Sequence, residues 1–263
     1  MARFVPLSRQ QHAGWTWNRP RHYGFAARHT LVRIVGAEIS YAATSMPLAF
    51  VRDGDGFQLV ALLSWEAGKN LFVGRNGQWR PGTYVPVIVR TYPFQYLRHD
   101  PDGQMALGFD EESGLVVAAG GEVPLFEGDG QLSGALTEIV GILDAQEKSR
   151  RATAAAIAAL SATGVIVPWD LKIPVGGTTK AVSGLFNIDE SGLQRLDDGA
   201  FRQLRNAGSL GIAYAQLISM VCIDALVRLA RQQAVEQKAV ESPASRGFAL
   251  SDILTRDDIL RFD

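Results

Sequence analysis

The sequence has little cysteine, little excess charge and no long apolar run. Its single cysteine, Cys222, excludes an internal disulfide framework. No apolar stretch approaches the roughly 18 residues that a membrane-spanning helix needs, and the N-terminus shows no apolar core typical of a secretory signal. The 26 basic residues nearly match the 27 acidic ones, whereas a nucleic-acid-binding protein ordinarily carries a basic excess. We therefore expect no membrane insertion, no nucleic-acid partner and a cytoplasmic location, with surface association by a non-classical route left open.

Residues typical of metal sites and of nucleophilic catalysis are also sparse. His22 and His29 have no cysteine or carboxylate nearby at the spacing of a metal site. Residues 176–180 lack the first glycine of a phosphate-binding loop, and Ser183 has no evident histidine partner. We predict no metal site and no cofactor, and the catalytic residues, if any, stay unknown. Weak calcium binding at the acidic, glycine-rich residues 53–56 or 127–130 is an alternative that stays open.

Two polar residues of the C-terminal half lie close to an apolar face. Cys222 belongs to the apolar run 217–223, and we expect it to pack as a small hydrophobic side chain. Asp224 follows it near the same face, and a buried carboxylate must be paired or neutralised. We expect an arginine partner for Asp224, with a catalytic role as the alternative.

The first 30 residues interleave aromatic and basic side chains in a segment without regular periodicity. Aromatic rings beside arginines can stack on a sugar or a small molecule while pairing with an anion. The other interpretation is an arm whose aromatic rings pack across a sheet. The candidate ligand-binding residues are Trp15, Trp17, Arg21, His22, Tyr23 and His29.

Between residues 47 and 118, turn signals alternate with β-prone runs. An Asp-Gly or Asn-Gly pair between such runs is a strong hairpin signal, because glycine supplies the positive φ of the turn. The turns are expected at residues 53–56, 76–77, 102–103 and 111–114. The strands expected to pair across the first three are 48–51 with 57–63, 70–73 with 78–80, and 84–97 with 105–109. A further strand is expected over 30–35. This pattern predicts an antiparallel β-meander.

The chain after residue 130 reads as mainly helical with one hairpin. Helical spacing of apolar residues runs from Leu136 to Ala162 and ends before Gly164, and its polar middle, 146–151, is expected as a kink or an exposed stretch. A hairpin is expected between 170–175 and 180–188. Helices are expected to start at Asp189, at Asp197 or Asp198, and at Ser209. The inner face of the last helix is expected to include Tyr214, Leu217, Val221 and Leu226.

These elements predict an α+β fold with an antiparallel β-meander in the N-terminal half and helices plus a second hairpin in the C-terminal half. We expect a sheet lobe with an aromatic arm over residues 1–125, a mainly helical lobe with one hairpin over 126–235, and a polar tail over 236–263. Because the hairpin places strands within the helical half, we also expect that half to add to the first sheet, which favours one joined unit.

Several stretches, taken together and in order, resemble a known family. They are residues 4–7, 62–63, 70–73 with Trp79, 84–86, 90–94, 184–190, 196–198, 204–205 and 213–220. In this combination the chain resembles the bacterial SapC-like family. The resemblance implies association with a crystalline bacterial surface layer or with a TonB-dependent receptor system, and it brings no established catalytic residues.

Three functions follow as hypotheses. We prefer a non-enzymatic accessory or interaction protein with a protein partner, serving an envelope-associated system. The alternative is an enzyme or enzyme partner that binds a small ligand in a cleft between the two lobes, where clefts tend to form. A component of the surface layer itself is the third. Neither the partner nor the oligomeric state can be derived from the sequence.

Overall fold

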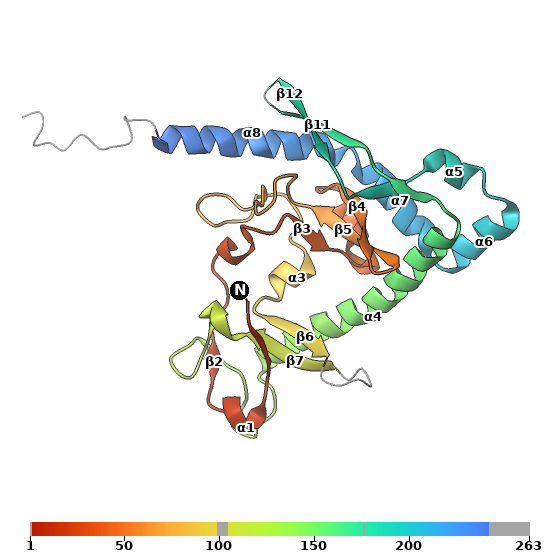
Figure 1. The fold of residues 1–263 in the computed structure, drawn as a ribbon. Helices are drawn as coiled ribbons and strands as arrows, with labels where there is room; N and C mark the ends of the chain where they lie inside the picture. Colours follow the sequence, from red (N-terminus) through yellow and green to blue (C-terminus); the bar gives the residue numbers. More distant parts are fainter. Residues whose placement is uncertain (1, 99–104, 176, 242–263) are drawn as a thin grey trace, which may run out of the picture.

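The structure is a computed structural model, and it describes residues 2–98, 105–175 and 177–241 (Figure 1). Within this part the chain forms an α+β fold, as predicted, in which every strand pairing is antiparallel. The strands are β1 (Phe4–Pro6), β2 (Thr16–Trp17), β3 (Leu31–Arg33), β4 (Leu48–Asp53), β5 (Gly56–Leu62), β6 (Phe94–Arg98), β7 (Met105–Asp110), β8 (Val116–Val117), β9 (Val123–Pro124), β10 (Ile166–Pro168), β11 (Leu171–Val175), β12 (Thr178–Val182) and β13 (Phe186–Ile188). The helices are α1 (Arg9–His12), α2 (Ile39–Ala42), α3 (Val87–Arg90), α4 (Gly134–Ala162), α5 (Glu190–Gln194), α6 (Asp198–Asn206), α7 (Ser209–Ser219) and α8 (Cys222–Glu241), with 3-10 turns η1 (Gly24–Ala26), η2 (Gly36–Glu38) and η3 (Glu111–Ser113).

The largest sheet has the strand order β10-β13-β4-β5-β3. The hairpin predicted around residues 53–56 is confirmed: β4 and β5 pair from Leu48 to Asp53, and Gly54 has a φ of 58°. Strand β13 joins this sheet through the pair Phe186 and Phe50. The sheet therefore combines strands from both sides of residue 125, whereas the hairpin of β11 and β12 forms a separate two-stranded sheet.

Two smaller sheets lie at the other end of the molecule, with strand orders β1-β7-β6 and β8-β2-β9. The pairing of β6 with β7 is as predicted, whereas the turn predicted at 102–103 lies outside the described residues. The predicted strand 84–97 is wrong in its first half, because α3 forms at Val87 directly after Pro86. Residues 70–73 and 78–80 meet only in the single bridge between Val73 and Trp79.

The second hairpin forms from β11 and β12, but the predicted strand 180–188 is divided. Its second part, β13, pairs with β10 and β4 instead of with β11. Gly184 lies between the two parts with a φ of 81°, a backbone conformation that glycine adopts at little cost. One predicted strand therefore contributes to two sheets.

Helix α4 runs unbroken from Gly134 to Ala162, so the kink considered at residues 146–151 is absent. Ser133 caps its start by accepting a hydrogen bond from the Leu136 N–H at 3.3 Å, and Gly164, with a φ of 72°, follows its end. Ion pairs of Glu147 with Arg150 and Arg151 lie on its surface. Pairs at these spacings stabilise a helix, which accounts for its continuity through a polar segment.

The single long helix predicted after Ser209 is two helices, α7 and α8, bent by 47° relative to each other. Tyr214 and Val221, predicted on the inner face, are 44% and 71% exposed. The buried face of α7 consists instead of Ser209, Ile212, Ala213, Gln216 and Ser219. The amide of Gln216 bonds the Ile188 N–H and the Leu48 carbonyl, so α7 is oriented by polar contacts to two strands.

The predictions for Cys222 and Asp224 have opposite outcomes. Cys222 is buried, as expected, whereas Asp224 is exposed on α8, so the expectation of a buried acid is wrong. No single described helix is long and apolar enough to cross a membrane. The bent pair α7 with α8 through Glu236 meets the length and composition criteria only when both helices are taken together.

The buried side chains form two hydrophobic clusters. The larger surrounds the five-stranded sheet and includes Phe50, Phe72 and Leu160. The smaller lies under the two three-stranded sheets and includes Trp17 and Leu143. Since α4 contributes Leu143 to the smaller cluster and Leu160 to the larger, this one helix links both.

Candidate functional site

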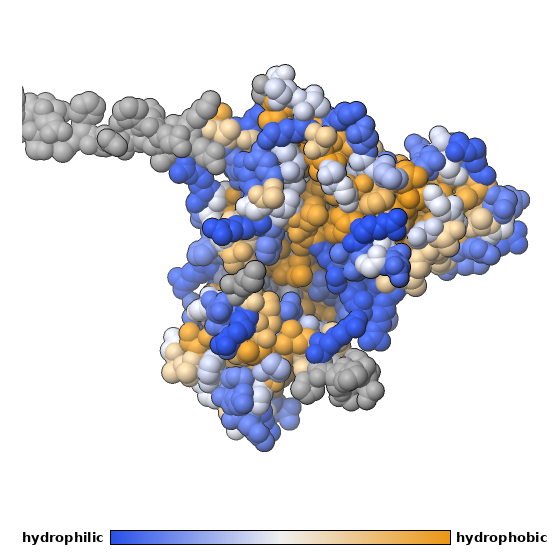
Figure 2. Space-filling view, in the orientation of Figure 1, coloured by the Kyte–Doolittle hydropathy of each residue, from blue (hydrophilic) through white to orange (hydrophobic). Residues whose placement is uncertain are grey.

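A cleft lies between the two hydrophobic clusters. Its walls come from both, with Val32 and Val89 of the larger cluster and Phe94 of the smaller one. Figure 2 shows apolar surface gathered in this hollow, with hydrophilic side chains around it. Two adjoining pockets make up the cleft, and both are lined by Arg33 and Ile88.

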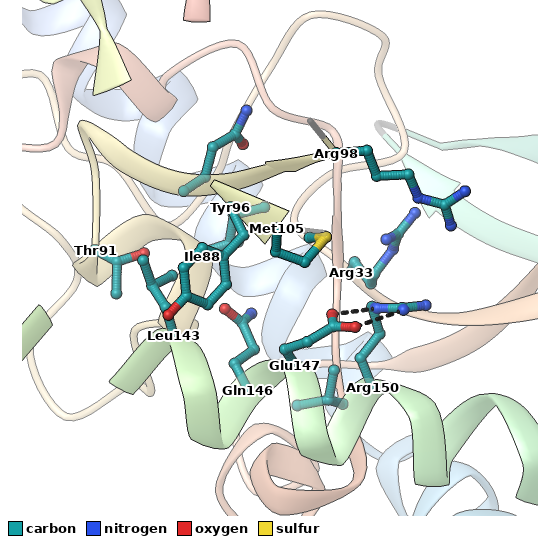
Figure 3. Close-up of a pocket in the computed structure, with 12 residues that line it drawn as sticks. Arg33, Ile88, Thr91, Tyr96, Arg98, Met105, Leu143, Gln146, Glu147 and Arg150 are labelled. Carbon is teal, nitrogen blue, oxygen red and sulfur yellow. Dashed lines mark hydrogen bonds and ion pairs between the residues drawn. The ribbon is translucent and has the colours of Figure 1, made fainter. Parts of the chain in front are cut away.

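The first pocket, here the arginine pocket, has a volume of about 270 Å³. Arg33 comes from β3, Arg98 from β6 and Arg150 from α4. In Figure 3 these three side chains extend on the same side of the pocket, while Tyr96 and Leu143 lie on the other side. Three guanidinium groups from three separate elements thus converge on one opening.

The charges in this pocket are only partly compensated. Arg150 donates two hydrogen bonds to Glu147, at 2.6 and 2.8 Å, and Arg151 donates a third at 3.0 Å. The Arg33 Nε donates instead to the neutral Gln58 amide oxygen at 2.7 Å. In the part of the chain that the structure describes, no carboxylate lies within 4.0 Å of Arg33. This guanidinium therefore keeps donors for an external anion.

The opposite wall of the arginine pocket is held by Tyr96. Its hydroxyl donates to the Asp144 carboxylate at 2.5 Å, which ties β6 to α4. Burial and this carboxylate raise the pKa of Tyr96 well above its ordinary value, so the phenol stays protonated. Tyr96 therefore forms a neutral part of the pocket wall and does not ionise near neutral pH.

The second pocket, here the apolar pocket, has a volume of about 280 Å³. Phe4, Phe25, Leu31 and Tyr92 lie along it. Phe25 stacks on Tyr92 with ring centroids 3.9 Å apart, and the Tyr92 hydroxyl donates to the buried Asp110 carboxylate at 2.8 Å. These contacts hold the aromatic wall in place.

A buried carboxylate fixes one side of the cleft. Glu38 is 2% exposed, and its Oε1 accepts from the Tyr84 hydroxyl at 2.9 Å and from the Val87 N–H at 2.8 Å. Its Oε2 accepts from the Val35 N–H at 3.3 Å. Burial and the Glu38 carboxylate raise the pKa of Tyr84 to about 12. Because α3 begins at Val87 and carries Ile88 into both pockets, Glu38 positions this part of the cleft wall.

The six candidate residues of the N-terminal arm do not come together at one place. Trp15 and Trp17 pack in the smaller cluster, with Trp17 only 3% exposed. Tyr23 packs against Trp79 of the larger cluster, with ring centroids 5.7 Å apart. Arg21 is exposed and pairs with Glu122 at 2.6 Å.

Of the two candidate histidines, only His29 lines the cleft. It borders the apolar pocket, where desolvation lowers the pKa of its imidazole below the ordinary value. His22 is exposed and accepts a hydrogen bond from the Gly24 N–H at 3.4 Å. No group of three or more histidine, cysteine or acidic side chains among the described residues could hold a metal ion. A ligand-binding role for the six arm residues stays a prediction.

The arginines of the cleft were not found from the sequence. Arg33, Arg98 and Arg150 are far apart along the chain, and each is an ordinary basic residue within its own segment. Only the arrangement of β3, β6 and α4 brings them to one pocket. The one local signal is the cluster of charges at 146–151, which by itself predicts only a kink or an exposed stretch.

Chemically, the cleft can hold an anion next to apolar groups. Arginine forms paired hydrogen bonds with carboxylates and phosphates, and the adjoining apolar pocket can bury a hydrophobic group. Glu147 limits the positive charge, because it is bound to Arg150 and Arg151.

We expect Glu147→Gln to lower the free energy of unfolding by about 0.5–1 kcal/mol near neutral pH. The two hydrogen bonds from Arg150, with the one from Arg151, lower the pKa of Glu147 to about 2. The stabilisation is therefore present above the ordinary carboxyl pKa of about 4.3 and is lost as the pH falls toward about 2. Urea unfolding across this range, with the exposed Glu138→Gln on the same helix as control, checks it. A wild-type advantage unchanged down to about pH 2 would contradict this assignment.

Fold and cleft together define an α+β protein of antiparallel sheets with an arginine-bearing cleft between two hydrophobic clusters. A family model described as SapC matches residues 7–226 of the 263-residue chain, so the chain belongs to the SapC family. No curated protein and no solved structure matches it.

Proposed function

We propose that this SapC-family protein is a non-enzymatic accessory protein that binds an acidic segment of a partner protein in its cleft. The observation that carries the proposal is the convergence of Arg33, Arg98 and Arg150 on a pocket that continues into an apolar one. Arginines suit carboxylate recognition because their guanidinium donors match carboxylate geometry. The apolar pocket would accept hydrophobic side chains of the same segment.

The setting is also part of the proposal. The family resemblance supports service to an envelope-associated system, either a surface layer or a TonB-dependent receptor system, and the sequence supports a cytoplasmic location. Fractionation of native cells tests this part, since recovery of the protein mainly from the culture medium or from an assembled surface layer would contradict it.

The binding proposal is tested with a fluorescently labelled, N-acetylated octapeptide of alternating glutamate and valine. We expect saturable binding by fluorescence anisotropy that weakens as salt rises, because the contact is largely electrostatic. Arg33→Ala should weaken binding about tenfold, the equivalent of about 1.4 kcal/mol. The Arg33→Ala and Arg98→Ala double variant should weaken it further.

The matched control is Arg202→Ala, which removes an exposed arginine of α6 away from the cleft. It should leave the affinity unchanged, and all these surface variants should change the free energy of unfolding by less than about 0.5 kcal/mol. A lysine and valine peptide of the same length should not bind. Equal binding of the acidic and basic peptides, or none by either, would refute the proposal.

A second candidate function is binding of a small amphipathic carboxylate by an enzyme or enzyme partner. The aromatic and aliphatic lining of the apolar pocket directly beside Arg33 favours it. Octanoate that binds at micromolar concentration and displaces the acidic peptide would favour this candidate. Octanoate without effect on peptide binding would favour the protein partner.

A further inference from the structure

Two strands that line the cleft are edge strands of different sheets. Strand β3 is the outermost strand of the sheet β10-β13-β4-β5-β3, and β6 is an outermost strand of the sheet β1-β7-β6. Leu31 and Arg33 of β3 border the apolar pocket, and Tyr96 and Arg98 of β6 border the arginine pocket. An edge strand presents unpaired backbone groups that a further strand can use.

The hydrogen-bond pattern identifies which groups of β3 point outward. The Leu63 N–H donates to the Thr30 carbonyl at 2.9 Å, and the Ile34 N–H donates to the Leu59 carbonyl at 3.0 Å. In an antiparallel ladder every second residue faces its partner strand, so residues 30, 32 and 34 face β5. Leu31 and Arg33 therefore direct their N–H and carbonyl groups away from the sheet. No backbone or side-chain partner for these groups exists within the described chain.

The side chains of β3 distinguish its two faces. Val32 is 6% exposed and packs in the larger cluster, whereas Leu31 is 37% exposed and Arg33 is also exposed. Since side chains alternate along a strand, Leu31 and Arg33 share the face opposite Val32. A strand added beside β3 would place every second side chain next to Arg33 and Leu31 on this face.

We propose that the partner segment binds as an added β-strand on the β3 edge, with acidic side chains facing Arg33. This rests on the proposed function and specifies its mode of recognition. Backbone hydrogen bonds to Leu31 and Arg33 supply affinity, and the alternating side chains supply specificity, as in other cases of strand addition. The charge of Arg33, with no carboxylate within 4.0 Å among the described residues, favours an acidic segment over any other extended chain.

Amide hydrogen exchange resolved by residue tests this mode with the same glutamate and valine octapeptide. Saturating peptide should slow exchange at Leu31 and Arg33 at least tenfold. Exchange at Val32, which already faces β5, should change far less. A peptide N-methylated at alternate residues keeps its charges but loses backbone donors, and it should bind at least tenfold more weakly.

A proline substitution gives an independent test from the protein side. Leu31→Pro removes an outward N–H without removing a bond of the sheet, and proline is tolerated on edge strands at such positions. We expect Leu31→Pro to bind the peptide at least tenfold more weakly than Leu31→Ala, because both variants lose the leucine side chain and only the alanine variant keeps the N–H. Thermal unfolding of both variants establishes that they fold.

The outcomes separate the two proposals. If the N-methylated peptide binds as well as the parent and Leu31 exchange is unchanged, strand addition is refuted while acidic binding in the cleft stands. If no acidic peptide binds, both are refuted, and the charge of Arg33 only protects the edge from unwanted pairing.

Discussion

Replacing Phe50 with alanine is expected to lower the free energy of unfolding by about 3–5 kcal/mol, the usual cost of emptying a buried aromatic position. Phe50 has no exposed surface, lies in β4, and pairs with Leu59 on one side and Phe186 on the other. It is therefore the residue through which β13, from the C-terminal half, joins the hairpin of the N-terminal half. Urea denaturation followed by circular dichroism measures the loss.

The control for this substitution is Phe201→Ala, because Phe201 is 37% exposed on α6. We expect it to cost less than about 1 kcal/mol. Tryptophan fluorescence and circular dichroism should report the same midpoint if the molecule unfolds as one unit. Loss of β13 alone, with the rest of the chain unfolding at the wild-type midpoint, would contradict the central role given to Phe50.

Glu38→Ala is the second substitution with a large expected effect, a loss of about 2–4 kcal/mol, because it leaves buried donors without an acceptor. The Val87 N–H and the Tyr84 hydroxyl both lose their acceptor at Oε1, and the Val35 N–H loses Oε2. Since Val87 starts α3, acidic-peptide binding in the cleft should weaken as well. Thermal unfolding and peptide titration measure the two effects.

Glu138→Ala is the matched control, because Glu138 is an exposed glutamate on α4. It should change the free energy of unfolding by less than about 0.5 kcal/mol. Glu38→Gln, which keeps an acceptor oxygen, should recover part of the loss. A Glu38→Ala variant as stable as the parent would show that the carboxylate does not serve as the acceptor described.

The sequence predicted the elements that depend on neighbouring residues, namely turns and helices. The Asp-Gly turn before Gly56 predicted the β4–β5 hairpin, and the apolar spacing from Leu136 predicted α4. The departures arise where distant contacts decide the structure. Helix α7 ends at Ser219, whose hydroxyl bonds the Leu48 N–H at 2.8 Å, a contact across the fold that helical periodicity cannot reveal.

The cleft was less predictable than the fold. Its arginines are isolated in the sequence, so they become a site only after β3, β6 and α4 are arranged in space. The aromatic and basic residues of the N-terminal arm are close together in the sequence and therefore resemble a site, yet Trp17 is buried in the smaller cluster. Local composition identifies segments that are rich in one kind of residue. This cleft is instead formed by single residues from several segments, so local composition does not identify it.

Helix α4 also sets the distance and the relative orientation of the two hydrophobic clusters that flank the cleft. Leu143 sits in one cluster and Leu160 in the other, with Arg150 between them. Each residue of a helix adds about 1.5 Å and turns the chain by about 100°. Inserting one residue between Leu143 and Arg150 would therefore turn the Arg150 guanidinium away from the pocket. It would also rotate one cluster relative to the other. The spacing along this segment should therefore tolerate substitution far better than any change in length.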